Sequence, residues 1–302
     1  MTQGLDVGGV TFSYRNGLVL KDLSFRAQGG RVIGVLGANG AGKSTLFKLI
    51  LGLLPLKEGQ IRVNNQPLGS LSSRKRAREM AYIPQAQAGV FQFSVMEVVL
   101  MGTTASFGIF GQPGPKEKAA ARQAMKLLGI EAFSNRQFDQ LSGGEQQLVL
   151  IARAVAQDAP ILIMDEPCAS LDYGNQIRVL EEIRTLSKQG YLVLFSTHNP
   201  QHVFLYAHEV LLIDGHSARV FGPPRDVLSE SLLSHVYGIP IRLEESARTG
   251  EVTVLPDFNE IRHGRPNHNV LHRGVNNEKE KNKTLIHPGS VDRRSGDCPD
   301  RL

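Results

Sequence analysis

The chain has 302 residues, of which 41% are hydrophobic and 21% are charged. This composition excludes disordered, collagen-like and membrane-spanning chains and is typical of folded globular proteins. The formal net charge is +5, but the basic residues are scattered, so we expect no nucleic-acid partner. The most apolar stretch, residues 46–56, is interrupted by Lys48 and Pro55, and the N-terminus has no signal-peptide pattern, so we expect a protein of the cytoplasm.

The N-terminal third predicts a small antiparallel sheet followed by a strand, a loop and a helix. Two alternating runs, VGGVTFSY and VLKDLSFRA, flank the turn dipeptide Asn16-Gly17 and read as a pair of antiparallel strands. Residues 31–37 (RVIGVLG) form a short apolar strand that enters a glycine-rich turn. Residues 43–54 then predict an amphipathic helix that ends before Pro55.

The rest of the chain predicts a parallel α/β sheet that is interrupted by a helical insertion. Apolar strands at 161–165 (ILIMD) and 191–196 (YLVLFS) adjoin helical sequence, as a parallel sheet requires. Two more strands are expected near Val210 and Val220. Between residues 85 and 141 the sequence changes to helical runs, including 115–128, and therefore predicts an inserted helical subdomain.

The domain boundaries follow from these changes in composition. We expect one α/β domain over residues 1–244, with the helical subdomain at about 86–155. After residue 244 apolar side chains become rare while polar and charged ones dominate, so residues 245–302 are predicted to form a polar, flexible tail. The four histidines of this tail have irregular spacing, which favours a solvated segment over a metal site.

A phosphate-binding loop connects the strand at 31–37 to the helix that follows it. Residues 37–44 (GANGAGKS) match the pattern GxxxxGK[ST], and the strand before it and the helix after it are the context that this motif requires. Glycines let backbone N–H groups turn toward phosphate oxygens, Lys43 reaches the β- and γ-phosphates, and Ser44 ligates Mg²⁺. The sequence therefore predicts a nucleoside triphosphate site.

Two acidic residues follow the apolar strand at 161–165. Asp165 ends the run ILIMD and Glu166 comes next, at a strand end where ligands bind in open α/β sheets. We expect Asp165 to hold Mg²⁺ through water and Glu166 to be the general base that activates the attacking water. The alternative is that these two acidic residues only cap a helix, and the phosphate loop in the same chain disfavours it.

A second candidate anion site precedes the helical run that starts after Leu141. Ser142-Gly143-Gly144 stands at the start of this run and is followed by Glu145. A serine and two glycines at a helix start present free N–H groups to an anion. Considered alone, these residues favour an ordinary helix cap over an anion site, and only the other motifs of the chain reverse that preference.

With the phosphate loop, LSGGE, MDEP, Ser170-Leu171-Asp172 and Ser196-Thr197-His198 in this order, the chain resembles the nucleotide-binding subunit of ATP-binding cassette (ABC) transporters. The resemblance covers about residues 5–240. It implies an α/β fold, the P-loop NTPase cassette, with a parallel core sheet, a small antiparallel β subdomain and an inserted helical subdomain. It also implies an ATPase that requires ATP and Mg²⁺. Cys168 stands where the family commonly has threonine, and Leu148 where arginine is frequent.

The resemblance implies a head-to-tail homodimer in which each ATP lies between the phosphate loop of one copy and the Ser142-Gly143-Gly144 loop of the other. His198 matches the family's switch histidine on the γ-phosphate, and Gln85 its Q-loop glutamine near Mg²⁺ or the attacking water. The implied catalytic residues are Glu166, His198 and Gln85; the metal ligands are Ser44, Gln85 and Asp165; and the ATP-binding residues are Tyr14, Gly37, Asn39, Gly40, Gly42, Lys43, Ser44, Thr45, Ser142, Gly143, Gly144 and Asp172.

Three further segments narrow the resemblance to one group of ABC importer ATPases. VMEVVLMG, LDYGNQ and THNPQH are similar to the ATPases that serve iron–siderophore, haem, cobalamin and some molybdate importers. The resemblance then implies polytopic permease subunits as partners, an extracytoplasmic binding protein as an indirect one, and a peripheral place on the cytoplasmic face of the membrane. We expect an iron complex as cargo. The alternatives are cobalamin or molybdate import and a soluble cassette ATPase of iron–sulfur cluster assembly.

Overall fold

The computed structural model describes residues 4–15, 17–84, 92–105 and 112–263. Ten strands form one curved sheet in the order β5-β4-β1-β2-β10-β9-β3-β8-β7-β6, and β11 and β12 form a separate hairpin. The strands are β1 (Gly4–Tyr14), β2 (Gly17–Gln28), β3 (Val32–Leu36), β4 (Glu58–Val63), β5 (Gln66–Pro67), β6 (Met80–Ile83), β7 (Ile161–Met164), β8 (Leu192–Thr197), β9 (Glu209–Asp214), β10 (Ser217–Gly222), β11 (Ile241–Glu245) and β12 (Val252–Pro256).

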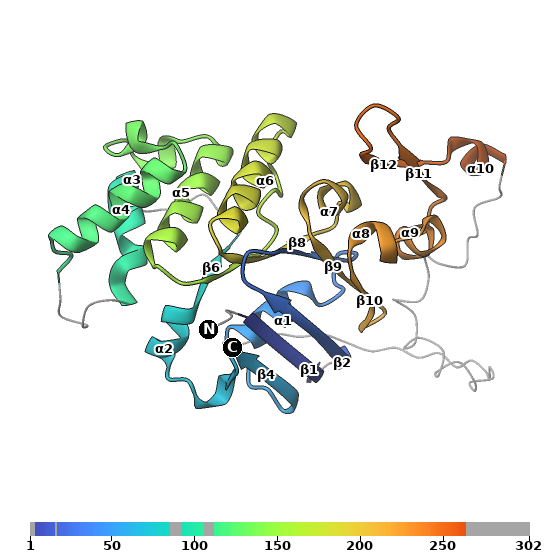
Figure 1. The fold of residues 1–302 in the computed structure, drawn as a ribbon, viewed down its shortest axis with the longest axis horizontal. Helices are drawn as coiled ribbons and strands as arrows, with labels where there is room; N and C mark the ends of the chain where they lie inside the picture. The colour runs from blue at the N-terminus through green and yellow to red at the C-terminus, as the bar shows by residue number, and fades with distance from the viewer. Residues whose placement is uncertain (1–3, 16, 85–91, 106–111, 264–302) are drawn as a thin grey trace, which may run out of the picture.

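The helices are arranged in groups around this sheet (Figure 1). Helices α3, α4 and α5 lie together at one end of the molecule, while α9, α10 and the β11–β12 hairpin lie at the other. The helices are α1 (Lys43–Ile50), α2 (Ser73–Glu79), α3 (Val95–Leu100), α4 (Pro115–Leu127), α5 (Gly143–Ala156), α6 (Tyr173–Lys188), α7 (Pro200–Tyr206), α8 (Pro224–Val227), α9 (Glu230–Tyr237) and α10 (Phe258–His263).

The central strands pair in parallel, and the N-terminal ones pair antiparallel. β3 pairs in parallel with β8 and β9, β8 with β7, and β7 with β6, whereas β1 pairs antiparallel with β2 and β4. Every residue of β3, β7 and β8 is buried, as expected for parallel strands that are covered on both faces. The predicted fold class, a parallel core sheet with a small antiparallel sheet beside it, is confirmed.

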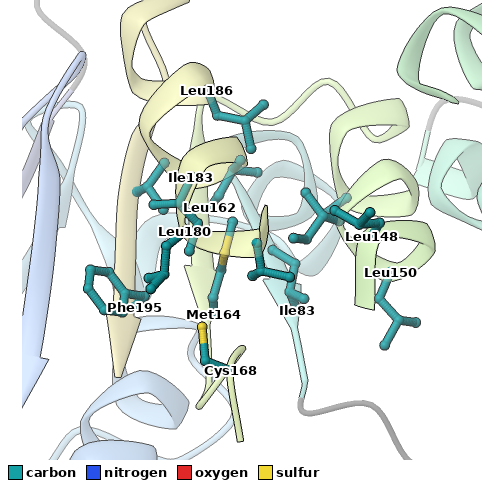
Figure 2. Packing of buried hydrophobic residues seen from close by; sticks show 14 of the residues in the cluster. Ile83, Leu148, Leu150, Leu162, Met164, Cys168, Leu180, Ile183, Leu186 and Phe195 are labelled. Carbon is teal, nitrogen blue, oxygen red and sulfur yellow. The ribbon is translucent and has the colours of Figure 1, made fainter. Parts of the chain in front are cut away.

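Successive residues of the central strands enter two separate cores. Ile163 and Leu194 contribute to a core with α1 and the antiparallel strands, while Met164 and Phe195 contribute to a core with α5 and α6. Figure 2 shows the second core, in which Leu180 and other side chains of α6 pack over β7 and β8. This alternation is the two-residue period of a strand, and it holds the carboxyl ends of the strands rigidly in place.

The structure corrects the predicted helix at 43–54. Helix α1 ends at Ile50, because Gly52 adopts a left-handed φ of +67° and the N–H of Leu53 bonds back to the carbonyl of Lys48 at 2.8 Å. This is the glycine C-cap geometry that closes many helices, so Gly52 ends the helix before Pro55 does. The sequence analysis did not predict four short elements, β4, β5, α2 and β6.

The structure also differs from the predicted tail at residues 245–302. Residues 241–263 form β11, β12 and α10. Ile241 is buried in the core, and Leu243 and Val254 pack against it. The low average content of apolar residues concealed this short alternating pattern, while residues 264–302 lie outside the described residues.

No helix in the described ranges is both long enough and apolar enough to cross a bilayer.

A close approach between two segments of the helical region predicts a sensitive glycine. Gly102, in the 3-10 turn Met101–Ala105 after α3, lies so near α5 that an added Cβ would overlap the carbonyl oxygen of Arg153. We expect Gly102→Ala to lower the free energy of unfolding by about 1–3 kcal/mol through overpacking, measured by urea denaturation. Gly69→Ala is the matched control, since its Cβ would meet nothing within 4 Å. Equal stability of the two variants would contradict this close packing.

Candidate functional site

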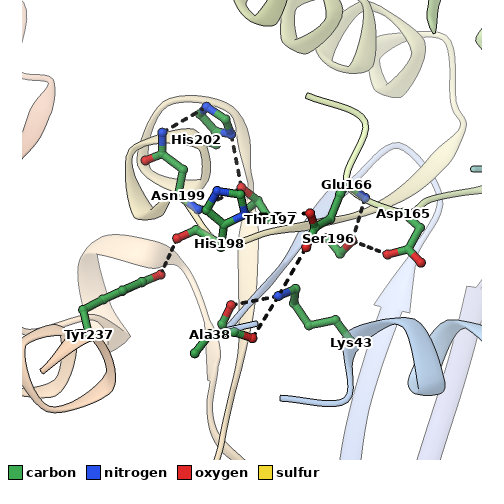
Figure 3. Close-up of polar contacts among 11 residues, drawn as sticks. Ala38, Lys43, Asp165, Glu166, Ser196, Thr197, His198, Asn199, His202 and Tyr237 are labelled. Carbon is green, nitrogen blue, oxygen red and sulfur yellow. Dashed lines mark hydrogen bonds and ion pairs between the residues drawn. The ribbon is translucent and has the colours of Figure 1, made fainter. Parts of the chain in front are cut away.

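The site is built at the carboxyl ends of three neighbouring parallel strands. Leu36 at the end of β3 pairs with Thr197 at the end of β8, and Met164 at the end of β7 pairs with Phe195. The phosphate loop, the Asp165-Glu166 pair and His198 therefore leave the sheet side by side. Figure 3 shows Lys43, Glu166 and His198 converging there.

The loop between β3 and α1 has the tight backbone that a phosphate cradle requires. Gly40 and Gly42 adopt left-handed φ angles of +82° and +99°. A Cβ on Gly42 would lie 2.9 Å from the side chain of Leu20, and a Cβ on Gly37 would lie 2.5 Å from the carbonyl oxygen of Ile213. Side chains at these positions would displace the loop, which explains the glycines of the motif.

Lys43 is a buried cation that points into this loop. Its side chain is only 5% exposed, and Nζ donates to the carbonyl oxygens of Gly37 at 2.9 Å and Ala38 at 3.1 Å. Nζ also lies 3.6 Å from Oε1 of Glu166. A buried ammonium needs such partners, and its place beside the start of α1 favours the binding of an anion.

Glu166 is held in an unusual backbone conformation between Lys43 and His198. Its φ is +48°, which is uncommon outside glycine. Its Oε2 lies 3.8 Å from Nδ1 of His198, and its backbone N–H donates to Oγ of Ser196 at 2.8 Å. The three side chains that the sequence assigned to phosphate and base chemistry are thus brought together.

Asp165 and Ser44 offer the oxygen ligands that Mg²⁺ prefers. Oδ1 of Asp165 accepts a hydrogen bond from Ser196 Oγ at 2.7 Å, and Oδ2 accepts one from the Tyr82 hydroxyl at 3.5 Å. Burial and the Asp165 carboxylate raise the pKa of Tyr82 to about 12, so this hydroxyl stays a donor. The donor set fits a hard divalent cation. Gln85, the third predicted ligand, lies outside the described residues.

Ser196 was missed as a site residue by the sequence analysis. Its hydroxyl accepts from the Glu166 N–H and donates to the Asp165 carboxylate, and the side chain is almost fully buried. It therefore joins β7 and β8 at the site. The signal was present, because Ser196 belongs to the Ser196-Thr197-His198 segment that carried the resemblance.

The Ser142-Gly143-Gly144 loop belongs to the helical region rather than to the phosphate loop of its own chain. Ser142 caps α5 through a capping box with Glu145, which lowers the pKa of that carboxyl. A Cβ on Gly144 would overlap the side chain of Asn175 in the first turn of α6. Asp172 caps α6 by accepting from the Asn175 N–H at 2.9 Å. The loops of Ser142 and Asp172 are therefore packed against each other.

Tyr14 lies at the end of the β1–β2 hairpin and is 45% exposed. Its ring makes an edge contact with Phe12 at a centroid distance of 4.9 Å. β2 also supplies Val19 and Leu20, the side chains nearest to Gly42. The hairpin thus places an available aromatic ring on the same subdomain that borders the phosphate loop. Asn39 and Thr45 lie in the loop and in α1, respectively.

A pocket of about 370 Å³ opens beside Glu166, between residues 166–170 and the segment 195–199. Cys168 forms part of its lining and is itself buried, which raises the pKa of its thiol to about 12. The pocket also reaches Gln176 of α6 and His202 of α7.

His202 fixes the segment behind His198. Its Nδ1 lies 3.2 Å from Oγ1 of Thr197, and its Nε2 lies 3.2 Å from Nδ2 of Asn199. Because the Asn199 amide nitrogen is a donor, Nε2 must accept and Nδ1 must carry the proton, which is the neutral tautomer. Burial, with a smaller effect of His198, lowers the pKa of His202 to about 4.

Comparisons with known proteins identify the relatives of this chain. The family model described as ABC transporter matches residues 20–169. An uncharacterised ABC transporter ATP-binding protein of Haemophilus influenzae is 40% identical over 78% of this chain and 88% of its own length. A zinc transport ATP-binding protein, TroB, of Treponema pallidum is 39% identical over 78% of this chain and 86% of its own length.

Two further proteins extend the comparison to haem and to solved structures. The hemin import ATP-binding protein HmuV of Streptomyces coelicolor is 36% identical over 79% of this chain and 84% of its own length. A structure described as an inward-facing metal-chelate type ABC transporter has a chain with a TM-score of 0.77 and 30% identity. That match covers 86% of this chain and all of the solved one.

The lowered pKa of His202 predicts an acid-sensitive fold. The folded state keeps His202 neutral and the unfolded state protonates it near pH 6.5, so the unfolded state binds more protons and stability falls with falling pH. The contribution is complete above pH 6.5 and is lost as the pH falls toward about 4. It amounts to about 3 kcal/mol, measured as the change in unfolding free energy between pH 7 and pH 4.

The variant His202→Gln isolates this contribution from the titration of carboxylates. Glutamine keeps polar atoms near Thr197 and Asn199 but cannot take up a proton in this range. We expect the variant to lose less stability than the wild type over the same pH interval. Parallel losses in the two proteins would show that His202 does not titrate differently in the folded and unfolded states.

Proposed function

The chain belongs to the ABC transporter family, and on that premise we propose that it is the ATP-hydrolysing subunit of an importer whose membrane subunits are separate chains. The ATP-binding subunits of this family bind ATP and hydrolyse it with Mg²⁺. The observation that carries the proposal is the convergence of Lys43, Glu166 and His198 within 4 Å contacts at one edge of the sheet.

In the proposed site the nucleotide is held by the loop and by α1. Lys43 exchanges its contacts with the loop carbonyls for the β- and γ-phosphates of ATP, and Tyr14 stacks on the adenine. Ser44, Asp165 and Gln85 would hold Mg²⁺, which neutralises charge on the phosphates. The contacts of Asp165 with Ser196 and Tyr82 support this role, because they fix the carboxylate before the ion arrives.

Glu166 is proposed to take the proton from the attacking water, and His198 to donate a hydrogen bond to the γ-phosphate. The closeness of the Glu166 carboxylate to both Lys43 and His198 supports these roles. Phosphoryl transfer depends mainly on positioning and on neutralised charge. Side chains that follow the ends of buried strands support the proposal, because such strands fix their position.

A second copy of the chain is proposed to complete each ATP site. The Ser142-Gly143-Gly144 loop stands on α5, away from the phosphate loop of its own chain, yet its capped helix start suits an anion. In a head-to-tail homodimer it would cover the γ-phosphate bound by the other copy. ATP would then favour the closed dimer, and hydrolysis would release it.

The cargo is proposed to be an iron complex, such as a siderophore or haem. Support comes from the relative that is named for hemin import and from the solved metal-chelate type transporter. Relatives named for zinc, manganese and cobalamin define the competing cargoes. In this arrangement the chain lies on the cytoplasmic face of the membrane, and an extracytoplasmic binding protein selects the cargo.

Glu166→Gln tests the proposed general base. The amide cannot take up the proton, so we expect kcat for ATP hydrolysis to fall by about 100-fold or more, while ATP binding persists and a stable dimer accumulates. Steady-state phosphate release and size-exclusion chromatography with MgATP measure the two effects. Hydrolysis at the wild-type rate would remove Glu166 from this role.

Lys43→Ala is the matched control for that experiment. It removes the buried ammonium and should weaken ATP binding itself, so no ATP-dependent dimer forms. The pair of variants thus separates failure to bind from failure to hydrolyse.

Co-purification tests the importer and its cargo. We expect the tagged chain, extracted from membranes in mild detergent, to bring down a polytopic permease. The binding protein that functions with this permease should bind an iron complex more tightly than zinc, manganese or cobalamin in calorimetry. Preference for zinc, manganese or cobalamin would identify that ligand as the cargo in place of the iron complex. Recovery of iron–sulfur assembly factors without a permease would overturn the importer proposal and favour a soluble cassette ATPase.

A further inference from the structure

Three hydrogen bonds tie the C-terminal elements to the segment that carries His198. The hydroxyl of Tyr237, the last residue of α9, donates to the carbonyl oxygen of His198 at 2.9 Å. The side-chain amide of Gln201 donates to the Val252 carbonyl and accepts from the Val254 N–H, both at 2.8 Å. Gln201 thus binds the edge of β12 as a neighbouring strand would.

The hydrogen bond from Tyr237 reaches the His198–Asn199 peptide, whose carbonyl and N–H groups are both hydrogen-bonded. The carbonyl of His198 accepts from Tyr237, and the N–H of Asn199 in the same peptide donates to Oγ1 of Thr197 at 3.0 Å. Figure 3 shows the bond from Tyr237 to the carbonyl of His198. A peptide plane fixed in this way leaves His198 little freedom about ψ, so the direction in which its side chain leaves the backbone is set.

The imidazole of His198 is otherwise weakly held. Its side chain is 54% exposed, and within the part of the chain that the structure describes its ion-pair partner is Glu166 at 3.8 Å. Neighbouring packing adds little, because a pocket of about 320 Å³ lies between residues 198–200 and the side chains of Ile239, Ile241 and Leu255. The backbone hydrogen bonds therefore carry much of the order in this segment.

Tyr237 is itself firmly placed. Gly238 follows it in a left-handed conformation, with φ of +69°, and its N–H bonds to the Ser234 carbonyl to close α9. The N–H of Ile241 then donates to Oγ of Ser234 at 2.8 Å, which fixes the turn into β11. Burial raises the pKa of the Tyr237 hydroxyl, so it remains protonated and able to donate.

We propose that Tyr237 is a positioning residue for ATP hydrolysis, which fixes the His198–Asn199 peptide and so aims the His198 side chain at Glu166 and the γ-phosphate. The β11–β12 hairpin, clamped by Gln201, supports the same segment. This proposal rests on the proposed role of His198. It assigns a positioning role to a part of the chain outside the phosphate loop, the acidic pair and the histidine.

The test compares full-length Tyr237→Phe with the wild type in steady-state hydrolysis of MgATP. Phenylalanine keeps the ring and removes only the donor. We expect kcat to fall about three- to ten-fold, the range that one lost hydrogen bond allows, with KM for ATP unchanged and the melting temperature lowered by at most about 4 °C. Tyr191→Phe is the matched control, since it removes a half-buried hydroxyl just before the opposite end of β8, and it should leave kcat unchanged.

The variant His198→Ala separates this proposal from the one on which it rests. If His198→Ala retains wild-type kcat, the proposed site itself is wrong. If His198→Ala lowers kcat and Tyr237→Phe does not, only the positioning role is overturned. In the double variant the loss of the hydroxyl should have no further effect on kcat, and an additional decrease would show that Tyr237 acts elsewhere.

Gln201→Leu provides a second route should Tyr237→Phe fail to fold. It leaves the tyrosine in place but removes both hydrogen bonds to β12. A fall in kcat at constant KM, absent in the His198→Ala background, supports the proposal. Wild-type kcat in Gln201→Leu overturns the role of the hairpin.

Discussion

The parallel register of β3, β8 and β7 is the constraint on which the site depends. Leu36 pairs with Thr197 and Met164 pairs with Phe195, so three strands end at the same edge of the sheet. The loops that leave this edge carry Lys43, Glu166 and His198. Since the strands are buried on both faces, a shift of one residue would exchange side chains between the two cores. The packing of the cores therefore specifies the geometry of the site.

The buried hydroxyl of Ser196 stabilises the strained backbone of Glu166. A non-glycine residue with positive φ, such as Glu166 at +48°, costs about 1–3 kcal/mol. The Ser196 hydroxyl accepts a hydrogen bond from the Glu166 N–H and donates one to the Asp165 carboxylate. Because Ser196 is buried, these two bonds offset part of that cost. In this conformation the Glu166 carboxylate lies 3.6 Å from Nζ of Lys43.

Much of the fold and the site could be predicted from local sequence. The phosphate loop, MDEP and the segment at 196–198 are short motifs whose chemistry is fixed by adjacent residues, and the strands around them are continuous apolar runs. Helix α1 ended early because a single glycine, Gly52, outweighed the apolar pattern around it. β11 and β12 were missed because their few apolar side chains find partners only in the folded core. Ser196 lies inside the motif at 196–198, but the motif does not show that its partner is Glu166, 30 residues away. Tyr237 lies in no motif, and its contact with His198 spans 39 residues.

Two kinds of structure position the residues of the site: the sheet and the side-chain hydrogen bonds that link distant segments. The sheet supplies rigid placement, since the backbone pairs and the two cores determine where each loop begins. Side-chain hydrogen bonds from Ser196, His202 and Tyr237 then determine how each loop leaves the sheet. The first contribution is shared by any protein with this sheet. The second is open to variation, because a donor such as Tyr237 lies in a segment that the sheet does not require. If Tyr237 positions His198 as proposed, substitutions in the C-terminal elements would alter the orientation of His198 while the phosphate loop keeps its geometry.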